Sequence, residues 1–590
     1  MVDDELPEEP ATPWWEDYRG DSLELPDDLC LIEPLGVVEW ERGDHAETSF
    51  DPSERTTDEQ IAHSPPRLGR SISSMALGTA FSRLSGLLRI LVLAYALGLT
   101  PIADAFNLAN TIPNMVFDLV LGGVIAATFV PVFIQQLETR AQKEAWRSIS
   151  AVLTLAVVVL GIATVLCVAL APWIIQSFTS LHTSGAGTTS AATLDSQRHA
   201  ATVLLRWFAP QIFFYGVIAL TTALLNIQRI FSPPMWVAVA NNVVCIGVLI
   251  LFATAGRAPS LETMAANPNR LLLLGLGSTL GVVAQALLLL PFLLKTETRY
   301  LWWRFDLQDL AVRATMKLGS WTVGLVIANQ VALFIILALA FGLGGNGQVS
   351  AYSYAWVFFQ TPYAIISISV MSGMTPALSS AFARGDLESY RTQFGKGLRS
   401  VLVIIVPLSM LLFIVAKPLL QLLLGLHGSG TGQAVMAGHA LAAFALGLPG
   451  FCAFQLAIRA YQTRHAGHQA FWLYLFENGL TIALAVLLVD HLGVTGLALA
   501  NSIAYSAAAL IGLMWLRAST GRLGDAGVFR PLLRVSIASL IMGIVALVGI
   551  NVTSSTSTGG LLLRLVVCGL GALAAYGLAI VVLAQYERGR

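Results

Sequence analysis

Two arginines in a stretch of otherwise apolar and small residues are the sequence's clearest candidates for chemistry. Arg83 and Arg89 lie in the segment FSRLSGLLRILVLAYALG, which begins at Phe81. On a helix with 100° per residue, the two fall on one wedge, about 120° apart. The wedge otherwise holds Gly, Ser and Thr, whereas the opposite side is rich in Leu and Phe.

Arginine offers paired donors that match phosphate geometry, and small neighbours leave room for a ligand. Arg83 and Arg89 therefore indicate an anion-binding wedge. The alternative is that both arginines only bridge helices or extend to lipid headgroups. Asp104 and Asp118 lie on one polar stripe of the next predicted helix, and Lys317 lies in a later one. We assign these three to the same substrate site; alternatively, the two aspartates only neutralise the arginines, and Lys317 is an ordinary residue between packed helices.

A second polar group lies in the last third of the chain. Glu477 and Asn478 fall in the middle of one predicted apolar helix, and Asn501 falls in the following one. Ionisable residues inside membrane helices are costly and usually face a cavity or a partner. These three could bind a coupling cation or a proton; the alternative is an ordinary hydrogen bond between helices.

No resident metal or cofactor is expected from the sequence. The chain's five cysteines are scattered, without CxxC or other metal-ligand spacing, and we interpret them as small core residues. No GxxxxGK[ST] motif is present, so if the protein moves a substrate, the energy would come from the membrane potential, a monovalent cation gradient or the substrate's own imbalance across the membrane. We also expect no nucleic-acid partner.

The composition predicts an all-α polytopic membrane protein. The chain is 56% hydrophobic and 12% charged, and its apolar runs are long enough for helices to cross a bilayer. We predict about fourteen transmembrane helices, with ends uncertain by a few residues, near 72–99, 104–136, 148–178, 201–227, 233–255, 271–294, 311–343, 349–383, 400–425, 434–460, 469–489, 493–516, 532–551 and 560–585.

The charge pattern predicts the topology. Residues 1–70 hold 20 of the 35 acidic and 5 of the 34 basic residues, and we expect a disordered acidic tail there. Loops on the same side as the N-terminus carry most remaining basic residues near the membrane, whereas the opposite loops carry Arg198, Arg257 and Arg270. The positive-inside rule then places both termini in the cytoplasm.

An internal repeat of about 245 residues divides the rest of the chain. Asp104-Ala105-Phe106 recurs as Ser350-Ala351-Tyr352, and Pro172 recurs as Pro418. Six helices in each repeat give two lobes of the same orientation, with substrate expected between them. We therefore expect an N-lobe at 71–305, a C-lobe at 306–520 and two further helices at 521–590.

Three consecutive stretches resemble a known family. FSRLSGLLRILVLAYALG is followed by IADAFNLANTIPN and then by LGGVIAATFVPVF. Together they resemble the MurJ/MviN family of lipid II flippases, within the multidrug/oligosaccharidyl-lipid/polysaccharide exporter superfamily. The resemblance extends over roughly residues 71–520. It implies a transporter, not an enzyme, that flips the undecaprenyl-pyrophosphate-linked peptidoglycan precursor across the bacterial cytoplasmic membrane for cell wall synthesis.

The family pattern carries over at Arg83, Arg89 and Asp104 but departs elsewhere. Where many members have arginines in helix 2 this chain has Phe117 and Asp118, and Gly122 and Val357 replace a family Glu and Arg. Either Lys317 or Arg206 compensates for the missing family cations, or the substrate site of this chain differs from that of the family. A pyrophosphate needs fixed cations, a sugar–peptide head group needs a polar cavity, and the lipid tail needs a lipid-facing groove.

Two other functions remain open. The chain could export another polysaccharide-linked lipid or a drug, or it could be a non-transporting scaffold for cell-envelope assembly. The expected partners are the lipid-linked precursor and membrane lipids. Cell-wall synthesis proteins could dock on the acidic tail, which carries Trp14, Trp15 and Tyr18.

Overall fold

The computed structural model describes residues 67–119, 142–181, 191–228, 230–257, 259–295, 302–306, 310–425, 431–464, 466–521, 529–552 and 558–588. Within these ranges the chain forms helices and connecting turns, with no strand. The predicted acidic tail before residue 67 and the predicted helical residues 120–136 lie outside the described residues.

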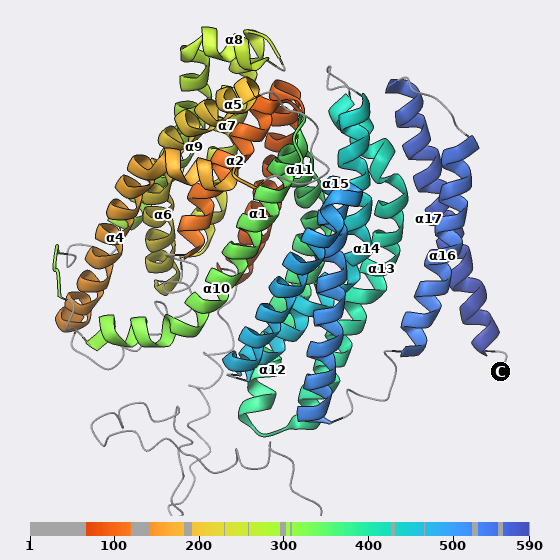
Figure 1. The fold of residues 1–590 in the computed structure, drawn as a ribbon. Coiled ribbons are helices and arrows are strands. Elements are labelled where there is room, and N and C mark those ends of the chain that lie inside the picture. The colour runs from red at the N-terminus through yellow and green to blue at the C-terminus, as the bar shows by residue number, and fades with distance from the viewer. Residues whose placement is uncertain are drawn as a thin grey trace, which may run out of the picture. The chain divides into compact units, whose positions relative to one another are not determined.

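Figure 1 shows the helices of the first half as one group, coloured red to yellow-green, and most helices of the second half as another, green to blue, while α10 runs from beneath α4 across to α11. The first group consists of α1 (Arg67–Leu97), α2 (Pro101–Phe117), α4 (Gln142–Phe178), α5 (Ala191–Phe208), α6 (Pro210–Ile227), α7 (Ser232–Thr254), α8 (Leu261–Ala266) and α9 (Pro268–Leu294). The second consists of α10 (Leu310–Gly342), α11 (Gln348–Pro362), the π-helix η6 (Tyr363–Ser367), α12 (Ile368–Ala383), α13 (Leu387–Gly425), α14 (Thr431–Thr463) and α15 (Gly467–Thr520). Two more helices, α16 (Phe529–Val552) and α17 (Thr558–Arg588), follow.

Twelve of the described helical spans are long and apolar enough to cross a membrane. One of them, α15, has 54 residues, which at 1.5 Å per residue would reach far beyond a hydrocarbon core of about 30 Å. It turns back at Gly493, where φ is 57° and ψ is −138°. Gly496 closely approaches Leu488, and Gly512 closely approaches Leu473, so the two halves run antiparallel as separate spans. With α2, whose described part has 17 residues, the fold agrees with the fourteen predicted spans.

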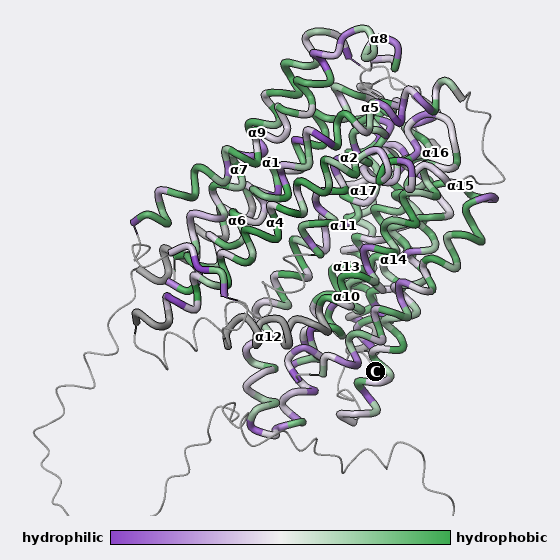
Figure 2. Tube along the Cα trace, turned by 60° about the vertical axis from the view of Figure 1, so that its left-hand side comes forward, coloured by the Kyte–Doolittle hydropathy of each residue, from purple (hydrophilic) through white to green (hydrophobic). Residues whose placement is uncertain are grey.

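Packing within each lobe follows the apolar character of the helices. In the N-lobe, α1 packs against α7 and α7 against α9; in the C-lobe, α14 packs against α13 and α15. The helices α16 and α17 pair with each other, and α16 packs against α13. Figure 2 shows that hydrophobic residues predominate along these helices, as expected for elements that cross a membrane.

The second helices of the two repeats, α2 and α11, end in the same irregularity. Thr100 caps α2, because its hydroxyl accepts a hydrogen bond from the Ala103 N–H (3.3 Å) and Pro101 follows it. Downstream, α2 runs into π-helical residues at 118–119, and α11 runs into η6 at Tyr363, the position expected from an offset of 245 residues. The expected lobe boundaries near 305 and 520 fall between α9 and α10 and at the end of α15.

Candidate functional site

Arg83 and Arg89 line one cavity between α1 and the α11–η6 segment. This cavity, called here the arginine cavity, has a volume of about 300 Å³. Its α1 wall includes Ser82 and Gly86, and its other wall includes Val357, Gln360 and Thr361. The structure therefore brings together the two arginines that the sequence singled out. Arg83 is exposed, and Arg89 is half-buried.

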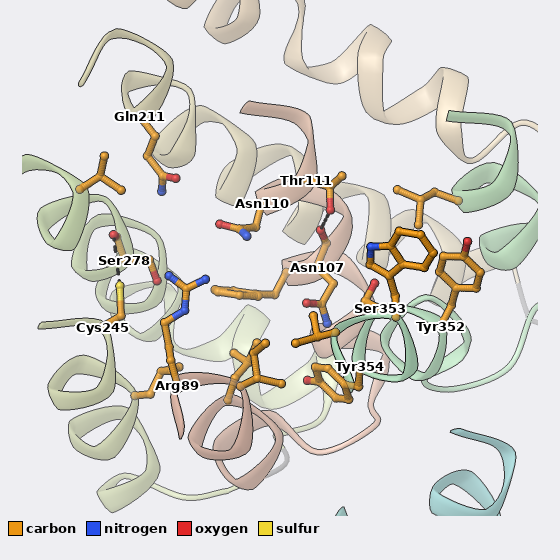
Figure 3. A pocket seen from close by; sticks show the side chains of 18 of the residues that line it. Arg89, Asn107, Asn110, Thr111, Gln211, Cys245, Ser278, Tyr352, Ser353 and Tyr354 are labelled. Carbon is orange, nitrogen blue, oxygen red and sulfur yellow. Dashed lines mark hydrogen bonds between the residues drawn. The ribbon is translucent and has the colours of Figure 1, made fainter. Parts of the chain in front are cut away.

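A second cavity, called here the inner cavity, continues from Arg89 deeper between the lobes. Its volume is about 260 Å³, and it shares Arg89, Ile90 and Val357 with the arginine cavity. Figure 3 shows Arg89 reaching into this space from α1. The polar residues of its N-lobe wall are Asn107, Asn110, Thr111, Gln211, Tyr215, Cys245 and Ser278.

Arginine is the only charged residue type among the described residues that line the two cavities. No Asp or Glu is among the described residues that line either cavity. In the part of the chain that the structure describes, Arg304–Asp306 is the one salt bridge, at 2.6 Å, so Arg83 and Arg89 form none there. Asp104 and Asp118 therefore make no direct ion pair with these arginines. Two uncompensated guanidinium groups at one cavity suit an anionic ligand.

The small residues of α1 serve two purposes. Ser82 and Gly86 line the arginine cavity, as the anion-site interpretation requires. The wedge also packs against α7, because the Asn242 amide donates to Ser85 Oγ (2.9 Å) and to the Ser82 carbonyl (3.2 Å). A Cβ atom added to Gly78 of α1 would lie 3.1 Å from Trp236, which is on α7. Close helix packing, which the sequence interpretation did not include, thus accounts for part of this pattern.

Asp104 joins the two lobes and lines neither cavity. Its side chain is 2% exposed. Its Oδ2 accepts hydrogen bonds from the backbone N–H groups of Gly347 (2.9 Å) and Gln348 (3.1 Å), and its Oδ1 accepts from Ser350 N (2.8 Å) and Ser350 Oγ (2.8 Å). An α2 carboxylate thus caps the N-terminus of α11, where the helix has unpaired N–H groups and partial positive charge. The substrate contact assigned to Asp104 stays a prediction from the sequence.

The other assigned cationic and acidic residues lie elsewhere. Asp118 is exposed, accepts a hydrogen bond from the Gln330 amide (3.3 Å) on α10 and lines neither cavity. Lys317 belongs to α10, in a stretch whose side chains the structure does not describe. Arg206 is exposed on α5 and lines neither cavity. Val357, which replaces a family arginine, does line both cavities, so that cation would have faced the same space.

The predicted cation group is only partly assembled. Glu477 is 2% exposed; its Oε1 accepts from Thr481 Oγ1 (3.1 Å), and its Oε2 has no hydrogen-bond partner among the described residues. The Asn478 amide donates to the Tyr474 carbonyl of its own helix (2.8 Å), and the Asn501 amide donates to Tyr352 Oη (3.1 Å). The Asn501 bond is the ordinary interhelical contact of the alternative interpretation, whereas Glu477 keeps an unpaired oxygen.

Sequence reasoning missed most of the inner cavity's polar wall. Gln211, Tyr215 and Ser278 are isolated polar residues in apolar helices, and Cys245 was interpreted only as a core residue. Cys245 is indeed buried, but it also lines the inner cavity. The available signal was weak: Gln211 directly follows a proline within a long apolar span.

Comparisons with known proteins agree with this architecture. A family model described as "Lipid II flippase MurJ" matches residues 93–567. A probable lipid II flippase MurJ of Buchnera aphidicola is 23% identical over 501 residues, covering 84% of this chain and 92% of the relative. The lipid II flippase MurJ of Burkholderia cenocepacia is 26% identical over 430 residues, covering 72% and 77%.

Solved structures show the same fold. A lipid II flippase MurJ in an inward closed conformation matches with a TM-score of 0.68 and 19% identity, over 88% of this chain and 99% of that one. An inward-facing multidrug resistance MATE family transporter of the MOP superfamily matches with a TM-score of 0.61 and 16% identity, over 76% and 96%. The fold and the cationic interlobe cavity thus define a multi-pass membrane transporter. The chain belongs to the lipid II flippase MurJ family, which confirms the family resemblance of its sequence.

Proposed function

We propose that this chain carries lipid II across the bacterial cytoplasmic membrane by alternating access, with the pyrophosphate held by Arg83 and Arg89. The observation that carries the proposal is that both guanidinium groups line one interlobe cavity that no described acidic residue lines. Guanidinium groups bind phosphate oxygens through paired, charge-assisted hydrogen bonds. The same charge disfavours cationic drugs, the cargo class that a drug exporter would need to accommodate.

The direction of access follows from α1. With both termini cytoplasmic, α1 enters the membrane from that side, and Arg83 precedes Arg89 along it. The exposed Arg83 then faces substrate arriving from the cytoplasm. At the far end, the bonds between Asp104 and the α11 N-terminus hold the lobes together. Alternating access requires that these bonds break when the lobes open on the other side.

Energy coupling and protein partners are further parts of the proposal. Glu477, with its unpaired buried Oε2, is the residue that would respond to a monovalent cation or to the membrane potential. The acidic tail, with 20 carboxylates before residue 71, is the segment that would dock cell-wall synthesis proteins. Membrane lipids contact the apolar outer surfaces of the helices.

Neutralising the arginines tests the substrate site. Each charge-assisted contact contributes roughly 1.5–3 kcal/mol, so Arg83→Ala and Arg89→Ala should each weaken lipid II binding about ten- to a hundredfold. Arg89→Lys keeps the charge but loses the paired donors, and it should fall between wild type and Arg89→Ala. The measurements are lipid II binding and complementation of a flippase-depleted strain at matched expression.

Arg206→Ala is the matched control, because Arg206 is exposed on α5 and outside both cavities. It should bind lipid II like wild type. A well-expressed double mutant, Arg83→Ala with Arg89→Ala, that complements fully and binds lipid II normally would remove both residues from the site. Full complementation of depleted cells by wild type also separates a flippase from a non-transporting scaffold.

A further inference from the structure

Gln211 presents an unpaired acceptor at the inner cavity. Its side chain is 1% exposed, and it lines that cavity from α6. Its Oε1 has no hydrogen-bond partner among the described residues. Figure 3 shows the Gln211 amide directed into the same space as Arg89. Buried polar groups are nearly always paired, so an exception at a cavity points to a ligand as its partner.

The orientation of this amide is fixed by Thr279. The Thr279 hydroxyl donates its single proton to the Trp207 carbonyl (2.7 Å), so toward Gln211 the hydroxyl can only accept. The Gln211 atom that faces Thr279, at 3.0 Å, must therefore be Nε2. Oε1 is left on the other branch of the amide, as an acceptor that awaits a donor.

The surroundings of Gln211 define the class of donor. The nearby cavity wall offers uncharged hydrogen-bonding groups from Asn110, Tyr215 and Ser278, together with the aromatic side chain of Trp356 on the opposite wall. Arg89 is the only charged side chain among the described residues that line this cavity. Several neutral donors and acceptors beside an aromatic ring suit a group that carries hydroxyls and amides on an otherwise apolar frame. Sugars have this chemistry, whereas a polyprenyl tail would leave the polar atoms unpaired.

We propose that the inner cavity is a sugar subsite in which Gln211 Oε1 accepts a hydrogen bond from a hydroxyl or acetamido N–H of the sugar next to the pyrophosphate. This inference rests on the proposed lipid II function and adds an orientation for the substrate. Arg89 lies about 9 Å beyond Arg83 along α1, at six residues of 1.5 Å each. Because Arg89 belongs to both cavities, the pyrophosphate lies at the boundary and the sugar lies beyond it, toward Asp104.

Two lipid probes test the subsite in the full-length protein. One is undecaprenyl pyrophosphate, and the other is the same lipid carrying a single N-acetylhexosamine without peptide. The substitution Gln211→Met keeps the length of the side chain but removes the acceptor. It should weaken binding of the sugar-bearing probe about tenfold and leave binding of the bare pyrophosphate unchanged. Arg89→Ala should weaken both.

Thr279→Val is the second variant, because it frees the Gln211 amide without removing it. It should give a smaller loss, again confined to the sugar-bearing probe. Gln197→Met is the matched control: Gln197 is also buried, on α5, but outside both cavities. It should bind both probes with wild-type preference.

The outcomes separate the two proposals. Equal weakening of both probes by Gln211→Met, or no weakening of either, overturns the sugar subsite. If Gln211→Met does not fold, an unchanged probe preference in Thr279→Val overturns it instead. A wild-type protein that binds neither probe nor lipid II overturns the proposed function itself. If wild type binds both probes and Arg89→Ala weakens both, but Gln211→Met weakens neither, the sugar subsite is overturned and the proposed function stands.

Discussion

Asp104 and Ser350 occupy equivalent positions in the two repeats, 246 residues apart, and they hydrogen-bond to each other. The Asp104 Oδ1 atom accepts from both the backbone N–H and the hydroxyl of Ser350, each at 2.8 Å. The contact joins the start of α2 to the start of α11, so a relative movement of these two helices would act on it directly.

This contact predicts a coupling between Asp104 and Ser350 in stability. Asp104→Asn weakens charge-assisted bonds, and Ser350→Ala removes the hydroxyl partner. We expect a double-mutant cycle on thermal unfolding in detergent to give an interaction energy of about 0.5–3 kcal/mol. Asp195→Asn, an exposed acid on α5, should not couple to Ser350→Ala. Additive effects of Asp104→Asn and Ser350→Ala would show that the contact does not hold the lobes together.

Val357 gives a gain-of-function prediction. It lines both cavities at the position where many family members have an arginine. Val357→Arg should place a third guanidinium beside the substrate and recover roughly tenfold in lipid II affinity in an Arg83→Ala background, given the strength of charged hydrogen bonds. Val357→Leu is the matched control for the change in volume and should not rescue. Failure of Val357→Arg to improve binding in a folded protein would place the pyrophosphate elsewhere.

Cys245 is a native reporter of the inner cavity. Among the four cysteines that the structure describes, all buried, it is the one that lines either cavity. In a Cys30→Ser background, a negatively charged methanethiosulfonate should modify Cys245, because Arg89 attracts the reagent. Modification should slow when lipid II is bound and when Arg89 is replaced by Ala. Labelling that persists in Cys245→Ser would assign the reaction to Cys167, Cys452 or Cys568.

Glu477 supplies a prediction about energy coupling. Gln at this position keeps the acceptor for Thr481 but removes the charge. Glu477→Gln should abolish the dependence of lipid II transport on an imposed cation gradient or membrane potential, while lipid II binding stays unchanged. Transport into proteoliposomes measures this, with Glu388→Gln, an exposed acid on α13, as control. Unchanged gradient dependence would leave Glu477 with a packing role only.

The sequence by itself determined the helical fold and the fourteen spans, and it singled out Arg83 and Arg89, which line one cavity. These features can be read from short stretches of sequence. The length of an apolar run shows whether it can cross the bilayer, and the fixed rotation per residue of a helix shows which residues share one face. The hairpin inside α15 also agrees with the two separate helices predicted at 469–489 and 493–516.

Only the tertiary structure decided which polar residues meet. In the folded chain, Asp104 caps the α11 N-terminus, Asn501 hydrogen-bonds to Tyr352 and Gln211 lines the inner cavity. Each of these outcomes depends on partners far away in the chain, so no local period or spacing encodes them. A polar residue on an apolar helix has the same local signature whether it caps a helix, joins two helices or faces a ligand; the packing of the lobes decides which.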